Sequence, residues 1–133
     1  MIPIVVDTNV YVSAIVFGGV PRQALQVIAE GPYRTCISAP ILKEVRRVLV
    51  VRFQYSLEKS DQLDLCLRES SQLVVPADTI AACSDPNDDM VLECAVAAKA
   101  QVIVTGDKAL LRLDPFRGVR IVTPAQFLLD AAD

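Results

Sequence analysis

The chain has 133 residues, of which 53% are hydrophobic and 22% charged, and its formal net charge is −3. This balance is typical of one folded domain, here predicted to span residues 1–133, and it excludes a disordered chain. No apolar run approaches the roughly 18 residues that a membrane-spanning helix needs. Asp7 interrupts the first apolar stretch too early for a signal peptide. We therefore expect a cytoplasmic protein with no membrane partner.

The chain contains no histidine, which excludes Ser-His-Asp and Cys-His catalysis and histidine zinc sites. Four cysteines (Cys36, Cys66, Cys83 and Cys94) form no CxxC pair, so we expect reduced thiols that are structural or incidental. The GxxxxGK[ST] and GxGxxG nucleotide-binding motifs are also absent. Catalysis by this chain would therefore depend mainly on carboxylates, hydroxyls, amides, lysine and arginine.

Short runs rich in β-branched residues alternate with helical patterns along the chain. The expected strands are residues 2–6, 34–38, 72–76, 101–105 and 119–123. The expected helices are residues 21–31, 39–50, 56–70, 86–100 and 124–133. Apolar runs without polar alternation are typical of strands that are buried on both faces. The pattern predicts an α/β domain with a parallel sheet between helices, and ligand sites at the carboxyl ends of the strands.

Two acidic residues follow directly on expected strands. Asp7 comes after residues 2–6, and Asp107 comes after residues 101–105. Parallel strands bring both carboxylates to one edge of the sheet, where a cation or several hydrogen-bond donors must offset their burial. Each aspartate can instead cap the helix that follows it, since Asp is a favoured N-cap.

The segment Ser84-Asp85-Pro86-Asn87-Asp88-Asp89 supplies a third candidate. Asp85 followed by Pro86 is typical of a helix start, and Asp88 three residues on fits a capping box. We therefore expect caps at Asp85 and Asp88. Asp89 begins the apolar face of the helix, and we expect its carboxylate to be the ligand.

Glu44 is a fourth candidate, on the flank of the apolar stripe of helix 39–50. From there it can reach the sheet edge, or it can form a surface ion pair with Arg47 three residues later. Carboxylates gathered at one edge repel each other, and a divalent cation with oxygen ligands is the usual resolution. The four acids Asp7, Glu44, Asp89 and Asp107 thus predict a Mg²⁺ or Mn²⁺ site.

These motifs, taken together and in order, resemble a PIN domain. The residues concerned are VVDTNVYVSA, the acid of LKEV, DPNDDMVLECA, VTGDKALL and IVTPAQFL. They are most similar to the toxin ribonucleases of prokaryotic toxin–antitoxin modules. The resemblance implies a three-layer fold with a five-stranded parallel sheet in the order 3-2-1-4-5, a Mg²⁺ or Mn²⁺ site, and cleavage of RNA by a homodimer that an antitoxin silences.

The resemblance also implies roles for single residues. Asp7, Glu44, Asp89 and Asp107 match the four acids of the family, which act as catalytic metal ligands. Thr8, Asn9 and Thr105 match polar positions that support these ligands, and Asp88 is a further supporting residue, either a ligand or only a helix cap. The sequence thus predicts a metal-dependent endoribonuclease.

Two other functions remain open at this point. An aspartyl-nucleophile phosphatase also has an aspartate at the end of its first strand, but it usually has a second aspartate two residues later, where this chain has Asn9. A catalytically silent scaffold that acts by binding a protein is the other alternative. The nine arginines, among them Arg46, Arg47, Arg52 and Arg112, either follow RNA phosphates or form solvated surface and antitoxin contacts.

Overall fold

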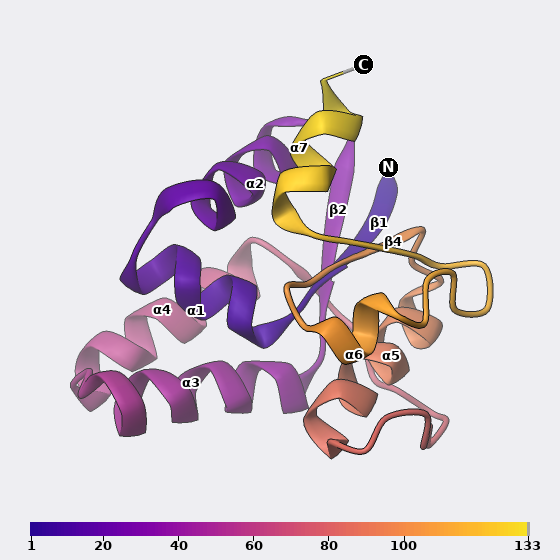
Figure 1. The fold of residues 1–133 in the computed structure, drawn as a ribbon. Coiled ribbons are helices and arrows are strands. Elements are labelled where there is room, and N and C mark those ends of the chain that lie inside the picture. Colours follow the sequence, from indigo (N-terminus) through magenta and orange to yellow (C-terminus); the bar gives the residue numbers. More distant parts are fainter. Residues whose placement is uncertain (133) are drawn as a thin grey trace.

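A five-stranded parallel sheet forms the centre of the molecule in the computed structural model, which describes residues 1–132 (Figure 1). The strands are β1 (Ile2–Val6), β2 (Tyr33–Ile37), β3 (Gln72–Leu73), β4 (Val102–Val104) and β5 (Arg120–Val122). Their order across the sheet is β3-β2-β1-β4-β5, as the resemblance implied, and all four pairings are parallel. The central strand β1 therefore ends beside the end of β4.

Helices cover the sheet on both faces. They are α1 (Thr8–Val16), α2 (Gly19–Glu30), α3 (Ala39–Phe53), α4 (Leu57–Glu69), α5 (Pro86–Ala98), α6 (Lys108–Leu111) and α7 (Pro124–Ala131). The helix α5 packs against β1 and β2, whereas α2 packs against β2 and α7 (Figure 1). The helices α3 and α4 lie side by side, and α3 also contacts α1. This three-layer arrangement leaves the carboxyl ends of the strands as the place where four helices begin.

The sheet core explains the missing polar alternation in the sequence. The innermost strand residues are completely buried, namely Ile4, Val5, Val6, Ile37, Ile103 and Val104. Each such side chain stabilises the fold by about 1.5 to 3 kcal/mol relative to exposure. Since helices cover both faces, the inner strand positions are apolar, and the polar strand residues Arg34, Gln72 and Arg120 stand at exposed positions.

Polar residues that follow the strands begin the next helices. After β2, the Oγ of Ser38 accepts a hydrogen bond from the backbone N–H of Ile41 at 3.4 Å and caps α3. After β5, the Oγ1 of Thr123 accepts one from the N–H of Gln126 at 3.0 Å and caps α7. Strand-to-helix junctions of this kind collect polar side chains at one edge of the sheet.

Some elements differ from the expectation. The helices α1 and α6 were not among the expected helices, and β3 has two residues where residues 72–76 were expected. Between α1 and α2, Gly18 and Gly19 have φ values of 77° and 63°, which favour glycine. The last expected helix, 124–133, ends at Ala131, and residue 133 lies outside the described residues.

A helix that spans a membrane needs both sufficient length and an apolar composition. Among residues 1–132, no single helix is long and apolar enough to cross a membrane. The helices α1 and α2 reach the required length and composition only when they are counted together, and they are bent by 108°.

Candidate active site

An acidic cleft of about 200 Å³ opens at the carboxyl edge of the sheet. Its walls come from the start of α1, the exposed side of α3, and the starts of α5 and α6. The lining residues are Asp7, Thr8, Asn9, Glu44, Arg47, Val48, Arg52, Asp85, Asn87, Asp88 and Asp107. Three of the four acids expected from the sequence, Asp7, Glu44 and Asp107, thus meet in one cleft.

Asp7 is fixed at the centre of the cleft where β1 passes into α1. Its backbone N–H donates to the carbonyl of Val104 on β4 at 2.9 Å, and its Oδ2 accepts from the Oγ1 of Thr105 at 2.7 Å. Only 4% of the residue is exposed. This burial raises the pKa of Asp7, and the charge of Asp107 adds to the rise, while the hydrogen bonds from Thr105 and from the N–H of Thr8 oppose it.

Asp107 caps α6 and lines the cleft at the same time. Its Oδ1 accepts from the backbone N–H groups of Ala109 at 2.8 Å and Leu110 at 3.3 Å. The Oγ1 of Thr105 accepts from the N–H of Asp107 at 3.0 Å and donates to Asp7. Asp107 thus serves both as a helix cap and as part of the cleft wall, and Thr105 connects the backbone N–H of Asp107 to the carboxylate of Asp7.

The structure corrects the expectation for the acids of α5. Asp88 lines the cleft, whereas Asp89 does not: its Oδ1 accepts from the backbone N–H groups of Ala82 at 3.0 Å and Cys83 at 2.8 Å. Asp85 caps the helix through the N–H of Asn87 at 2.9 Å, as expected. Asp89 thus holds the segment that precedes α5, because that irregular segment has N–H groups that need acceptors.

The periodicity of α5 indicates that Asp88 lies on the helix face that packs against the sheet, and the prediction from sequence did not use this periodicity. Asp88 is three and four residues before Val91 and Leu92, which are both completely buried against the sheet. Residues at these spacings share a helix face, so Asp88 points towards the sheet edge. Asn87, a cleft residue that was not anticipated, lies next to it at the start of the helix.

Charge repulsion among the acids is visible at Asp88. Only 8% of the residue is exposed. Burial raises the pKa of Asp88 to about 6, and the negative charges of Asp107 and Asp7 contribute to the rise. The cleft therefore holds more negative charge than the protein itself compensates.

Glu44 satisfies both alternatives that the sequence left open. It lines the cleft with 15% of its side chain exposed, and it is paired with Arg47 in a two-pronged contact. Arg47 and Arg52 are the cations of the cleft wall, and the guanidinium of Arg52 lies 6.0 Å from the ring centroid of Phe53. One wall is thus basic while the floor is acidic.

Comparison with known proteins identifies the family. The PIN domain family matches residues 3–109, a stretch that contains all the acids of the cleft. The chain belongs to the PIN domain family. It is also 32% identical over 117 residues to an uncharacterized protein of Methanocaldococcus jannaschii, MJ1680, with 84% of this chain and 75% of that protein covered.

The PIN fold is also found among solved structures. The crystal structure of VapBC2 from Rickettsia felis, bound to a DNA fragment from its promoter, contains a chain that superposes with a TM-score of 0.62. The match covers 92% of this chain and 98% of that chain, at 18% sequence identity. This likeness supports the fold of the PIN domain described above.

The possible metal ligands in the cleft of this PIN domain are of the kind that a hard divalent cation prefers. All its candidate ligands are oxygens, and the Oγ1 of Thr8, a buried residue that lines the cleft, has no hydrogen-bond partner in the described part of the chain. No three of the acids among residues 1–132 converge as tightly as one shared metal shell would require. Mg²⁺ often binds through one or two carboxylates and keeps several waters, so such convergence is not needed for binding.

Proposed function

We propose that this PIN domain is a metal-dependent endoribonuclease that hydrolyses RNA phosphodiester bonds with Mg²⁺ or Mn²⁺. PIN domains are generally nucleases. The observation that carries the proposal is the uncompensated acidic cleft at the ends of β1 and β4, where burial and the charge of Asp107 raise the pKa values of Asp7 and Asp88. We assign the metal-binding role to these three aspartates and to Glu44, with Asp88 in the place expected for Asp89.

A bound divalent ion would supply the positive charge that the cleft lacks and would make a water molecule acidic enough to act as nucleophile. Asp7 is held ready for this by Thr105, and Asp107 is held by the backbone of α6. Arg47 fixes the orientation of Glu44. No histidine is available, so the carboxylates themselves must orient the attacking water and accept its proton.

The basic wall gives the substrate phosphates a place to bind. Arg52 lies at the cleft, and its guanidinium forms no ion pair in the described part of the chain. Setting the four metal-binding acids aside changes the formal net charge from −3 to +1. The low overall charge therefore does not argue against a nucleic-acid substrate, because the acids that dominate it belong to the cleft.

The sequence motifs further support the role of the toxin in a toxin–antitoxin pair, acting in the cytoplasm as a homodimer with a cognate antitoxin protein. The structural neighbour VapBC2, with a promoter DNA fragment bound, is in keeping with this assignment. Co-expression with the adjacent reading frame in its source genome, followed by co-purification, tests for the antitoxin.

The decisive experiment is incubation of the purified protein with end-labelled RNA in the presence of Mn²⁺, Mg²⁺ or EDTA. We expect internal cleavage with either ion and none with EDTA, and loss of cleavage in Asp7→Asn. Asp61→Asn is the matched control, because this exposed carboxylate lies on α4 and does not line the cleft. Phosphate release from small monoesters in place of RNA cleavage would indicate the phosphatase, and silence on both substrates would indicate the scaffold.

A further inference from the structure

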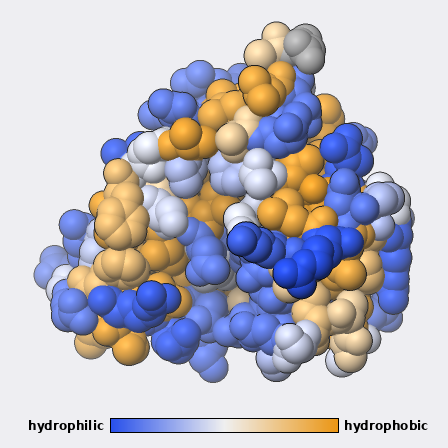
Figure 2. Space-filling model, in the orientation of Figure 1, coloured by the Kyte–Doolittle hydropathy of each residue, from blue (hydrophilic) through white to orange (hydrophobic). Residues whose placement is uncertain are grey.

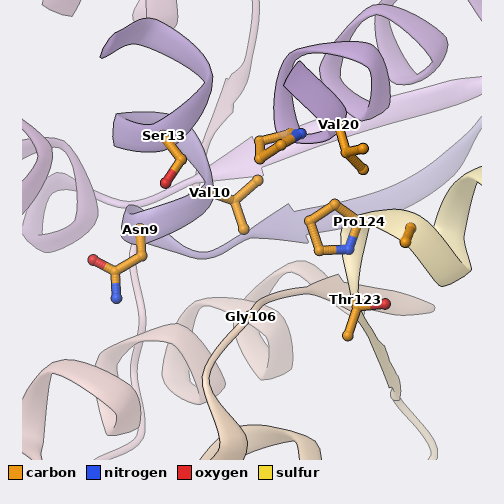
Figure 3. A pocket seen from close by; sticks show the side chains of 9 residues that line it. Asn9, Val10, Ser13, Val20, Gly106, Thr123 and Pro124 are labelled. Carbon is orange, nitrogen blue, oxygen red and sulfur yellow. The ribbon is translucent and has the colours of Figure 1, made fainter. Parts of the chain in front are cut away.

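We propose that a second cavity, beside the acidic cleft, binds one unpaired base of the RNA, next to the phosphate that is cleaved. This inference rests on the proposed function and adds a base-recognition site to it. The second cavity has a volume of about 360 Å³ and lies between α1, the start of α2, the loop from β4 to α6, and the start of α7 (Figure 3). Its size is within the range of about 300–1,000 Å³ found for small-molecule pockets.

The second cavity adjoins the acidic cleft. Asn9 lines both of them, and Gly106, which lines the second cavity, stands between Thr105 and Asp107 in the chain. A nucleotide whose phosphate lies at Asp7 and Asp107 thus has its sugar and base directed towards either solvent or this cavity. Because the two cavities are adjacent, an RNA bound at the acidic cleft can place a nucleotide in the second cavity.

The walls of the second cavity are apolar and carry no charge. Val10 points from α1 towards Pro124 across the cavity, with Thr123 beside Pro124, as Figure 3 shows. Figure 2 shows apolar surface between hydrophilic patches on the face of the molecule seen in Figure 1. Apolar walls that face each other suit the two faces of a flat heteroaromatic ring, and they do not suit a phosphate, which would lose its hydration there without a cation.

Three polar residues, Asn9, Ser13 and Thr123, are among those that line the second cavity. Asn9 offers an amide and Ser13 a hydroxyl. The backbone N–H and C=O of Gly106 have no backbone hydrogen-bond partner among residues 1–132. Bases are recognised through donors and acceptors on their edges while their faces stack, so mixed polar groups beside apolar walls favour a base over an aliphatic side chain of another protein.

The test fills the second cavity without touching the acids. Ala125 lines the cavity on an exposed position of α7, so Ala125→Trp narrows it. Gln126→Trp, on the neighbouring exposed position that does not line the cavity, is the matched control. Two quantities are measured for each protein. The first is the affinity for a 2′-O-methyl RNA oligonucleotide, followed by fluorescence anisotropy. The second is the rate at which the protein with Mn²⁺ hydrolyses bis(p-nitrophenyl) phosphate, a phosphodiester that has no bases. A series of oligonucleotides, each with one abasic position, locates the base.

In the wild type and in Gln126→Trp, we expect one abasic position to weaken binding by about 10- to 100-fold, the range for a stacked base. In Ala125→Trp, the intact oligonucleotide should bind as weakly as that abasic one, with hydrolysis of the small diester unchanged. Equal binding at every abasic position in the wild type would overturn the proposal. The proposal is also overturned if Ala125→Trp binds the oligonucleotide as tightly as the wild type does. The same holds if the only change in this variant is in its oligomeric mass, because the cavity would then be an interface between copies of the chain. If no RNA or diester is cleaved but the abasic effect is present, the base site stands and the proposed nuclease function fails.

Discussion

The neighbouring acids Asp88 and Asp89 should respond in opposite ways to the same substitution. Asp88→Asn removes a carboxylate that is buried beside Asp7 and Asp107. We expect the metal-free protein to become more stable at neutral pH. Asp89→Asn instead weakens the hydrogen bonds that hold the N–H groups of Ala82 and Cys83, and the metal-free protein should become less stable.

The magnitude for Asp88 follows from its pKa. The rise of the pKa from its ordinary value of 3.8 to about 6 corresponds at most to about 3 kcal/mol, because a tenfold change in proton affinity equals about 1.4 kcal/mol. Solvent in the cleft screens part of this, so we expect a gain of about 1 to 2 kcal/mol. For Asp89→Asn, exchange of a charged acceptor for a neutral one should cost about 1 kcal/mol.

The sign of the pH dependence can be worked out for the same group. Because the folded protein holds the proton of Asp88 more tightly than the unfolded chain, the wild-type protein binds more protons when folded between about pH 4 and 6. Its stability without metal should therefore fall as the pH rises through this window and level off above it. Asp88→Asn should reduce this slope and leave the part that comes from Asp7, whose pKa is also raised, while Asp89→Asn should keep the whole slope.

The assay is thermal unfolding in EDTA over a pH series, repeated at neutral pH with Mn²⁺. The wild type and Asp89→Asn should be stabilised by Mn²⁺, while Asp88→Asn should respond weakly and should not cleave RNA. If Asp88→Asn keeps the full response to Mn²⁺ and Asp89→Asn loses it, the exchange of roles derived from the structure is refuted. Equal pH slopes in all three proteins would refute the charge argument on its own.

Three further predictions concern the surroundings of the cleft. Thr105→Val removes the donor to Asp7 and should lower stability by about 1 to 2 kcal/mol in unfolding experiments and cleavage by at least about tenfold, while Thr105→Ser should restore both. Arg52→Ala should raise KM for RNA and reduce the salt dependence of binding without changing the melting temperature; an unchanged KM would exclude a phosphate contact. Replacement of the buried cysteines Cys36 and Cys94 by Ala should lower stability in chemical unfolding but leave turnover of the folded enzyme intact, and a lost turnover without unfolding would contradict a purely structural role.

The sheet and its longer helices could be predicted because burial on both faces leaves a clear trace in the sequence. The runs at residues 2–6 and 34–38 agree with β1 and β2 to within a residue. The helix α1 escaped prediction because its sequence, TNVYVSAIV, is rich in β-branched residues and buried on several sides, so it has no polar face. The strand β3 is shorter than expected because the chain leaves the sheet after Leu73, and Val75, although apolar, is 84% exposed.

The residues of the site could be predicted only where their position directly after a strand determines their place in the fold. Asp7 and Asp107 were found because a residue that ends a parallel strand must lie at the ligand-binding edge of the sheet. The periodicity of α5 favours Asp88, but the role of Asp89 depends on an irregular segment, residues 77–85, whose N–H groups donate to its carboxylate. No periodicity describes such a segment, so its demand for an acceptor becomes visible only in three dimensions.

The hydrogen bond between Thr105 and Asp7 joins residues that are 98 positions apart. During synthesis on the ribosome, Asp7 leaves the exit tunnel well before its partner Thr105 and the carboxylate of Asp107. Until β4 docks beside β1, the acids are dispersed and the cleft does not exist. The cleft therefore forms only after the segment that carries β4 and Asp107 has been made, and the proposed nuclease would be inactive until then.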